Sequence, residues 1–140
     1  MRSKLSIPYV VCVGLVCNVG ALWGHHGDAG RFIETPVSLE GTVISWRLMN
    51  PHSIIVLDAE NEQGEIVRWR AEFGDPVGMA TTYGWARDTL KPGDKITMTG
   101  RRVKSGAPEF NLTEQARIIR TETGEEIFRT EDYHGEPQQP

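Results

Sequence analysis

Three of the four histidines in this 140-residue chain are of a type and spacing that could bind a metal ion. His25 and His26 are adjacent, and His52 follows Asn50-Pro51 at the expected end of a strand. Imidazole is the commonest protein ligand for copper and zinc. A mature chain beginning at His25 would offer its amine and imidazole to copper together with the His52 ring, an arrangement called a histidine brace. The competing interpretation is that the pair binds nothing and that His52 hydrogen-bonds the turn after Pro51.

The segment before this pair has the features of a secretory signal peptide. Arg2 and Lys4 provide a positive start, residues 7–16 are apolar, and small residues occur within 18–24. We therefore expect residues 1–24 to be removed from the mature protein. Retention of the segment as a membrane anchor is a second interpretation, which its proline, asparagine and glycine residues disfavour.

The position of cleavage decides whether a histidine becomes the N-terminus. Cleavage after Ala21 fits the small-x-small rule better, whereas only cleavage after Gly24 exposes His25. Both cysteines, Cys12 and Cys17, fall inside the leader, so the mature chain would contain none. A secreted domain without disulfides suits the bacterial periplasm, and we expect a periplasmic or secreted protein.

Charge and motif content argue against several functions. Without Arg2 and Lys4, the chain has 13 basic and 19 acidic residues, a net charge of −6. This balance argues against nucleic acid as a partner. The sequence contains no nucleophile elbow, phosphate loop, Cys-x-x-Cys or His-Glu-x-x-His motif. We therefore assign no catalytic residue and favour a binding module over an enzyme, with enzymatic activity left open.

Beyond the leader, the hydrophobic pattern predicts one β domain. Residues 25–36 are expected to form an arm, residues 37–128 the domain, and residues 129–140 a disordered tail rich in acidic residues, proline and glutamine. Alternation with a period of two predicts strands over 37–48, 53–59, 67–73, 95–103, 112–121 and, briefly, 126–128.

A short helix is expected between the third and fourth strands. Asp75 is a suitable N-cap, Pro76 suits the first helical position, and Gly84 suits the C-terminal cap. Strands and helix in this order indicate a mostly β fold, a small OB-like barrel of five to six strands.

The first strand is expected to bend. Its apolar residues change face partway along, from Val37, Leu39 and Val43 on one side to Ile44, Trp46 and Leu48 on the other. Such a switch, close to Gly41, predicts a β-bulge of the kind that curls a sheet into a barrel.

Three residues are candidates for binding a ligand on the barrel: Trp46, Asn50 and Arg87. Exposed aromatic side chains of OB barrels stack on sugars or bases. Trp69 is instead expected in the core, and Trp85 at one end of the barrel. Arg87 and Asp88 are also candidates for a structural ion pair.

Several arginines alternate outward along the strands, namely Arg68, Arg70, Arg101, Arg102 and Arg117. They would form either a positive face or a solvated face balanced by acidic neighbours. We favour the second interpretation, with Glu72 and Glu114 as the balancing residues.

Two sequence motifs indicate a resemblance to a known family. Residues 47–52 read R-L-M-N-P-H after Trp46, and residues 84–94 read G-W-A-R-D-T-L-K-P-G-D. With the histidine pair after a leader, they are similar to a family of small secreted bacterial proteins of unknown function. The four-residue step from Trp46 to Asn50, and Gly27 in place of serine, depart from that family's pattern. The resemblance implies a secreted location and brings no established activity.

We therefore predict a periplasmic OB-like binding or accessory module, with copper as its expected cofactor, held by His25, His26 and His52. One alternative is a metal-free envelope module that binds a protein or a glycan on its barrel face. Another is a copper-dependent oxidase with a histidine brace. The expected partner is an envelope protein or a small ligand, with no membrane span after the leader is removed.

Overall fold

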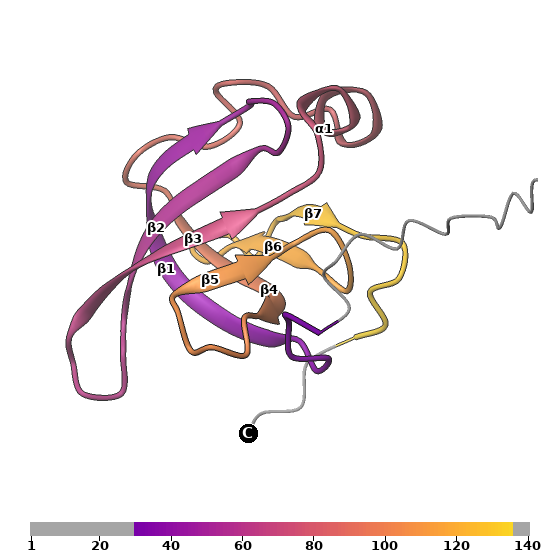
Figure 1. The fold of residues 1–140 in the computed structure, drawn as a ribbon. Helices are drawn as coiled ribbons and strands as arrows, with labels where there is room; N and C mark the ends of the chain where they lie inside the picture. The colour runs from indigo at the N-terminus through magenta and orange to yellow at the C-terminus, as the bar shows by residue number, and fades with distance from the viewer. Residues whose placement is uncertain (1–29, 136–140) are drawn as a thin grey trace, which may run out of the picture.

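Residues 30–135 are described in the computed structural model of the protein and contain seven strands and one helix (Figure 1). In chain order these are β1 (Val37–Arg47), β2 (Ile54–Glu60), β3 (Ile66–Glu72), α1 (Pro76–Tyr83), β4 (Lys95–Arg102), β5 (Glu109–Asn111), β6 (Arg117–Arg120) and β7 (Glu126–Arg129). Within this range, the single short helix lacks the length and apolar character needed to cross a membrane.

Five of the strands close into a barrel. The order is β1-β2-β3-β5-β4, and β4 pairs back onto β1. The β3–β5 pairing is parallel and every other pairing is antiparallel. Together with a helix between β3 and β4, this order confirms the predicted OB-like barrel.

The long first strand serves both sides of the barrel, as Figure 1 shows by its curved path. Its first half pairs with β4 and its second half with β2. Val43 pairs with Leu57 and Ser45 with Val56, so the predicted bulge lies at Ile44. The prediction that Ile44 shares a face with Trp46 is wrong. The extra residue at the bulge turns Ile44 outward, where it is 37% exposed.

The prediction of one fifth strand over residues 112–121 is wrong: within that range only β6 forms, at Arg117–Arg120, and β5 lies before it at Glu109–Asn111. β5 and β6 pair with successive parts of the same edge of β4, and residues 112–116 leave the ladder between them. The Asn111 side chain accepts hydrogen bonds from the Thr113 N–H and hydroxyl, at 2.9 and 2.8 Å. Gln115 then takes a left-handed conformation with φ of 49°. A local turn therefore overrides the alternation of apolar residues.

The helix forms where its terminal residues predict it. Asp75 Oδ1 accepts from the backbone N–H groups of Val77 and Gly78, at 3.0 and 2.9 Å. Pro76 occupies the first turn, and Gly84 ends the helix in the left-handed conformation with φ of 68°.

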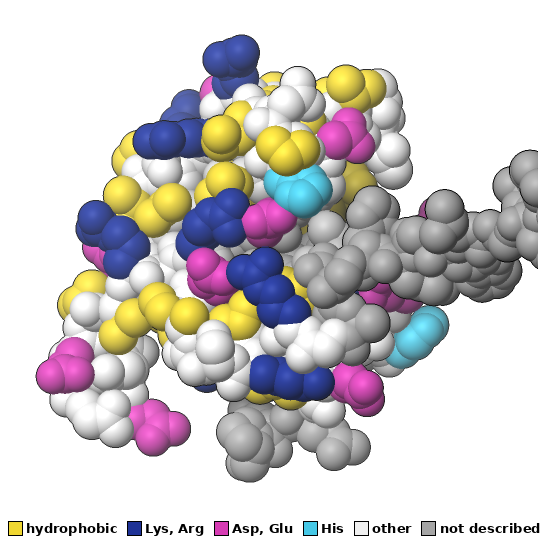
Figure 2. Space-filling model, in the orientation of Figure 1, with side chains coloured by type: hydrophobic (Ala, Val, Ile, Leu, Met, Phe, Trp, Pro, Cys, Tyr) yellow, Lys and Arg dark blue, Asp and Glu magenta, His cyan; other side chains and the backbone are white. Residues whose placement is uncertain are grey.

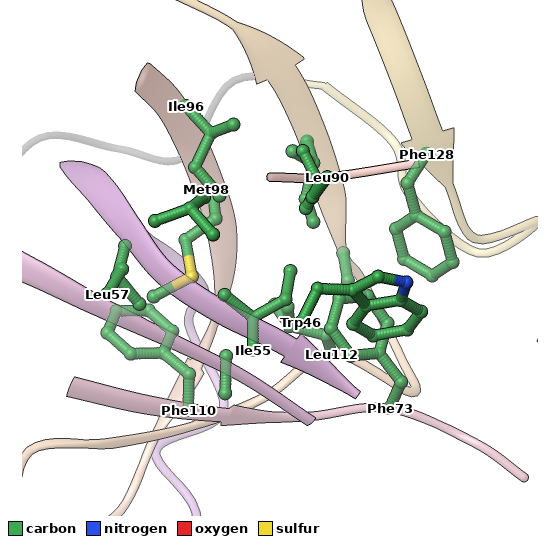
Figure 3. Close-up of a cluster of buried hydrophobic side chains, with 14 of the residues drawn as sticks. Trp46, Ile55, Leu57, Phe73, Leu90, Ile96, Met98, Phe110, Leu112 and Phe128 are labelled. Carbon is green, nitrogen blue, oxygen red and sulfur yellow. The ribbon is translucent and has the colours of Figure 1, made fainter. Parts of the chain in front are cut away.

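The core fills the barrel (Figure 3) and includes Met79 of α1. Leu57, Met98 and Phe110 gather at one end of the cluster, and aromatic rings gather at the other. The Trp46 ring centroid lies 4.9 Å from that of Trp85 and 5.5 Å from that of Phe73. Trp85 is 3% exposed, and Trp69, likewise in the cluster, is 8% exposed, which confirms both as core residues.

Packed structure continues beyond the expected start of the tail at residue 129. Arg129 is the last residue of β7, and Thr130 and Tyr133 after it are buried. The Thr130 N–H donates to the Ala116 carbonyl at 3.0 Å. The arginines 117 and 129 lie 5.9 and 5.1 Å from the Tyr133 ring centroid, which explains why this aromatic residue is held against the sheet.

Candidate functional site

His52 lies in the loop between β1 and β2, two residues before the start of β2. The Ser53 N–H donates to the Gly74 carbonyl, and the Phe73 N–H donates to the Ser53 carbonyl, each at 2.9 Å. These two bonds extend the β2–β3 ladder beyond Glu72 and hold the backbone that follows His52. The His52 side chain is 50% exposed. The imidazole of His52 is therefore accessible, and the backbone that follows it is fixed by hydrogen bonds to the residues after β3.

The carboxylate of Glu72 fixes one ring nitrogen of this imidazole. His52 Nδ1 is hydrogen-bonded to Glu72 Oε1, and Glu72 Oε2 accepts from the Arg70 guanidinium at 2.7 Å. Burial acts to raise the pKa of Glu72, but hydrogen bonds from Arg70 and His52 and their charges lower it overall. An ionised carboxylate at Nδ1 favours the tautomer with its proton there. Within residues 30–135 no hydrogen bond engages His52 Nε2, which leaves that nitrogen available to a ligand.

The arm before β1 is attached to the same outer face of the barrel. Glu109 of β5 is paired in register with Arg70 of β3. Glu109 Oε2 accepts from the Arg31 guanidinium at 2.7 Å, and Phe32 forms a bridge with Val103 after β4. Figure 2 shows acidic and basic side chains interspersed on the face in view, with a histidine beside an acidic side chain. The arm therefore joins the barrel one strand away from the Glu72–His52 pair.

Four of the five outward arginines are paired with acids, as the solvated-face interpretation predicts. Arg70 contacts Glu72 and Arg101 contacts Glu114, the two acids expected from the sequence. The remaining contacts are those of Arg68 with Asp58 at 2.8 Å, of Arg117 with Glu126 at 2.8 Å, and of Arg102 with the Trp69 ring, 4.6 Å from its centroid. The structure thus provides a neutralised surface and not a concentrated positive face.

Trp46, Asn50 and Arg87 are brought to one end of the barrel but differ in accessibility. Trp46 is only 8% exposed, and its indole Nε1–H donates to the Ala86 carbonyl at 2.8 Å. Asn50 and Arg87 are exposed. The expected ion pair between Arg87 and Asp88 is absent from the part of the chain that the structure describes. Trp46 is therefore a packing residue, and only the other two candidates offer accessible side chains.

Most of the 84–94 motif builds this end of the barrel. Gly84 caps α1, Trp85 and Leu90 are buried, and the Trp85 indole donates to the Ile127 carbonyl at 2.9 Å. Asp94 Oδ2 accepts from the Lys91 N–H at 3.0 Å. These contacts give the motif a structural role that accounts for its tryptophan, its leucine and Asp94.

The described residues do not form a complete metal site by themselves. In residues 30–135 there is no group of three or more histidine, cysteine, aspartate or glutamate side chains arranged to hold a metal. His25 and His26, the other predicted ligands, lie outside the described residues.

Glu72 is the partner that the sequence prediction of this site omitted. It was assigned only a balancing charge on the outer face. The signal that could have found it is the β2–β3 register, which pairs Ile54 with Glu72 and thereby brings the residue two positions before Ile54 close to that carboxylate.

Comparison with known proteins identifies a family but no activity. The sequence model of a family of unknown function, DUF6152, matches residues 12–110. The match spans β1 to β4 and ends within β5; it includes every predicted site residue, while β6 and β7 lie beyond it. No curated protein matches the chain at a significant level.

Proposed function

We propose that this chain, which belongs to the DUF6152 family, is a metal-binding module of the bacterial envelope, with copper held by His25, His26 and His52. The predicted leader supports export to the periplasm, and the OB-like barrel supplies a stable support for the loop that carries His52.

The state of His52 is the observation that carries this proposal. Its Nδ1 is held by Glu72, and its Nε2 has no hydrogen-bond partner in residues 30–135. A histidine that ligates a metal typically donates its second ring N–H to a carboxylate, which orients the ring and increases its basicity. The contact of Glu72 with Arg70 holds that carboxylate ionised and in place. A histidine that is exposed only for solubility needs neither a carboxylate on its ring nitrogen nor an arginine that holds that carboxylate.

The length of the arm is sufficient to bring the other histidines to His52. Glu109 and Glu72 lie on neighbouring strands two residues apart in register, a separation of about 8 Å between Cα atoms. His26 is five positions before Arg31, which contacts Glu109. Five extended residues span about 17 Å, about twice the separation between Glu109 and Glu72, which supports a shared ligand set.

Native mass spectrometry of protein purified from the periplasm, with one equivalent of copper, tests the proposal. We expect one retained copper ion and an N-terminus that includes both adjacent histidines. A His52→Ala variant should lose tight binding while keeping its fold. His134→Ala is the matched control, because His134 is exposed and is not among the predicted ligands; its copper affinity should equal that of the natural sequence.

The outcomes separate the competing functions. A mass that begins at His25, with one copper ion, indicates the histidine brace, and turnover of a substrate would then indicate an oxidase. Unchanged copper affinity in His52→Ala, or no retained copper in the unaltered protein, would refute the proposed ligand set. The protein would then be sought among metal-free modules that bind an envelope protein or a glycan.

A further inference from the structure

A pocket lies between α1 and the neighbouring strands, and none of the proposed metal ligands is among the described residues that line it. Its volume is about 180 Å³. Gly78, Met79 and Tyr83 of α1 contribute to one wall, and Leu112 after β5 and Phe128 of β7 contribute to the other. The pocket therefore depends on the packing of the helix against the end of the sheet.

Three apolar residues that line this pocket are buried. Met79 is 2% exposed, Leu112 is fully buried, and Phe128 is 4% exposed. An apolar cavity of about 150 Å³ is large enough to hold one benzene molecule. The size and lining therefore suit a single six-membered ring or an aliphatic group of similar volume.

One negative charge stands at the edge of the pocket. Among the residues that the structure describes, Asp75 is the only charged one that lines it. Asp75 Oδ1 caps the helix, whereas no hydrogen bond within residues 30–135 engages Oδ2. A Cβ added to Gly78 would lie 3.1 Å from Oδ2, which places this oxygen directly beside the pocket residue Gly78.

Two aromatic rings add to the attraction for a cation. The centroids of Tyr83 and Phe128 lie 4.7 Å apart, and both residues line the pocket. The faces of such rings attract ammonium groups. A carboxylate, two aromatic rings and a ring-sized space thus line one pocket, and no basic side chain from residues 30–135 lines it.

We propose that this pocket binds a small hydrophobic amine in its protonated form. The apolar part of the ligand occupies the space between Met79, Leu112 and Phe128, and its ammonium group donates to Asp75 Oδ2. The site requires neither copper nor His52, so it is independent of the function proposed above.

A titration of the ¹⁵N-labelled protein with benzylammonium, followed by two-dimensional NMR, tests this site. We expect the chemical-shift changes to centre on Gly74, Gly78, Met79 and Thr113, with Kd on the order of 1 mM for a ligand of this size. Benzyl alcohol has the same ring without the charge and is the comparison ligand.

The Asp75→Asn variant separates charge from fold, because asparagine caps a helix as well as aspartate does. We expect its Kd for benzylammonium to rise roughly three- to fivefold, while its Kd for benzyl alcohol stays the same. Gly78→Ala is a second variant. Alanine favours the helix, but its methyl group would crowd Oδ2 and weaken binding of the amine. Shifts that spread over the whole surface, or an equal affinity of Asp75→Asn for benzylammonium, would overturn the proposal.

Discussion

Replacement of Trp46 by phenylalanine tests whether this residue packs the barrel or binds a ligand. The structure assigns it a packing role, because the ring is 8% exposed and lies against Trp85 and Phe73. Its indole N–H also joins β1 to the loop after α1 through the Ala86 carbonyl. Trp46→Phe should therefore lower stability without changing copper affinity.

The size of the effect follows from two losses. The hydrogen bond to Ala86 contributes about 1 kcal/mol, and the smaller ring leaves a partial cavity that costs about 1–2 kcal/mol. The free energy of unfolding should fall by about 2–3 kcal/mol, equivalent to roughly 10 °C in Tm for a domain of this size. Urea unfolding followed by circular dichroism measures the first quantity, and a thermal scan measures the second.

Trp69→Phe is the matched control for the hydrogen bond. Trp69 has the same exposed fraction, 8%, but within the described residues its indole N–H has no hydrogen-bond acceptor. The same atoms are removed in both variants, so Trp46→Phe should be the more destabilised by about 1 kcal/mol. Equal losses would refute a stabilising role for the bond to Ala86. A loss of copper affinity in Trp46→Phe with unchanged stability would refute the packing role itself.

Two further perturbations test the barrel and its C-terminal packing. Gly100→Ala should lower the free energy of unfolding, measured in urea, by about 1–3 kcal/mol, because the added Cβ would lie 2.4 Å from Leu112 Cδ2. Gly30→Ala is the control and should change this free energy little, since the space around Gly30 is open. Equal stabilities of the two variants would contradict the close packing at β4. Acid should also destabilise the protein through Asp132. Burial acts to raise the pKa of Asp132, but hydrogen bonds to its charged form, one of them from the Gln115 N–H at 2.9 Å, lower it below the ordinary value of 3.8. Because the folded pKa is the lower one, this stabilisation is present above pH 3.8 and is lost as the pH falls through the folded pKa. Urea midpoints at pH 7 and pH 3 should differ less in Asp132→Asn than in the natural sequence, and an equal difference would show that this carboxylate does not contribute.

The sequence predicted one part of the candidate site and missed another. The sequence identified His52 as a candidate ligand because histidine in a loop after a strand is visible locally. It did not identify Glu72 as the partner, because these residues meet only through the β2–β3 register. Trp46 was ambiguous for a related reason, since the orientation of its ring depends on the bulge at Ile44 and on the distant loop that contains Ala86.

The sequence by itself determined the features that depend on neighbouring residues. Alternation of apolar side chains specified the described strands other than β5, and Asp75 with Gly84 specified the helix, because caps and strand faces are local properties. Only the tertiary structure decided which strands close the barrel, where residues 112–116 interrupt the edge beside β4, and which carboxylate faces His52. These features arise from contacts between segments far apart in the chain, where burial and pairing outweigh local preference.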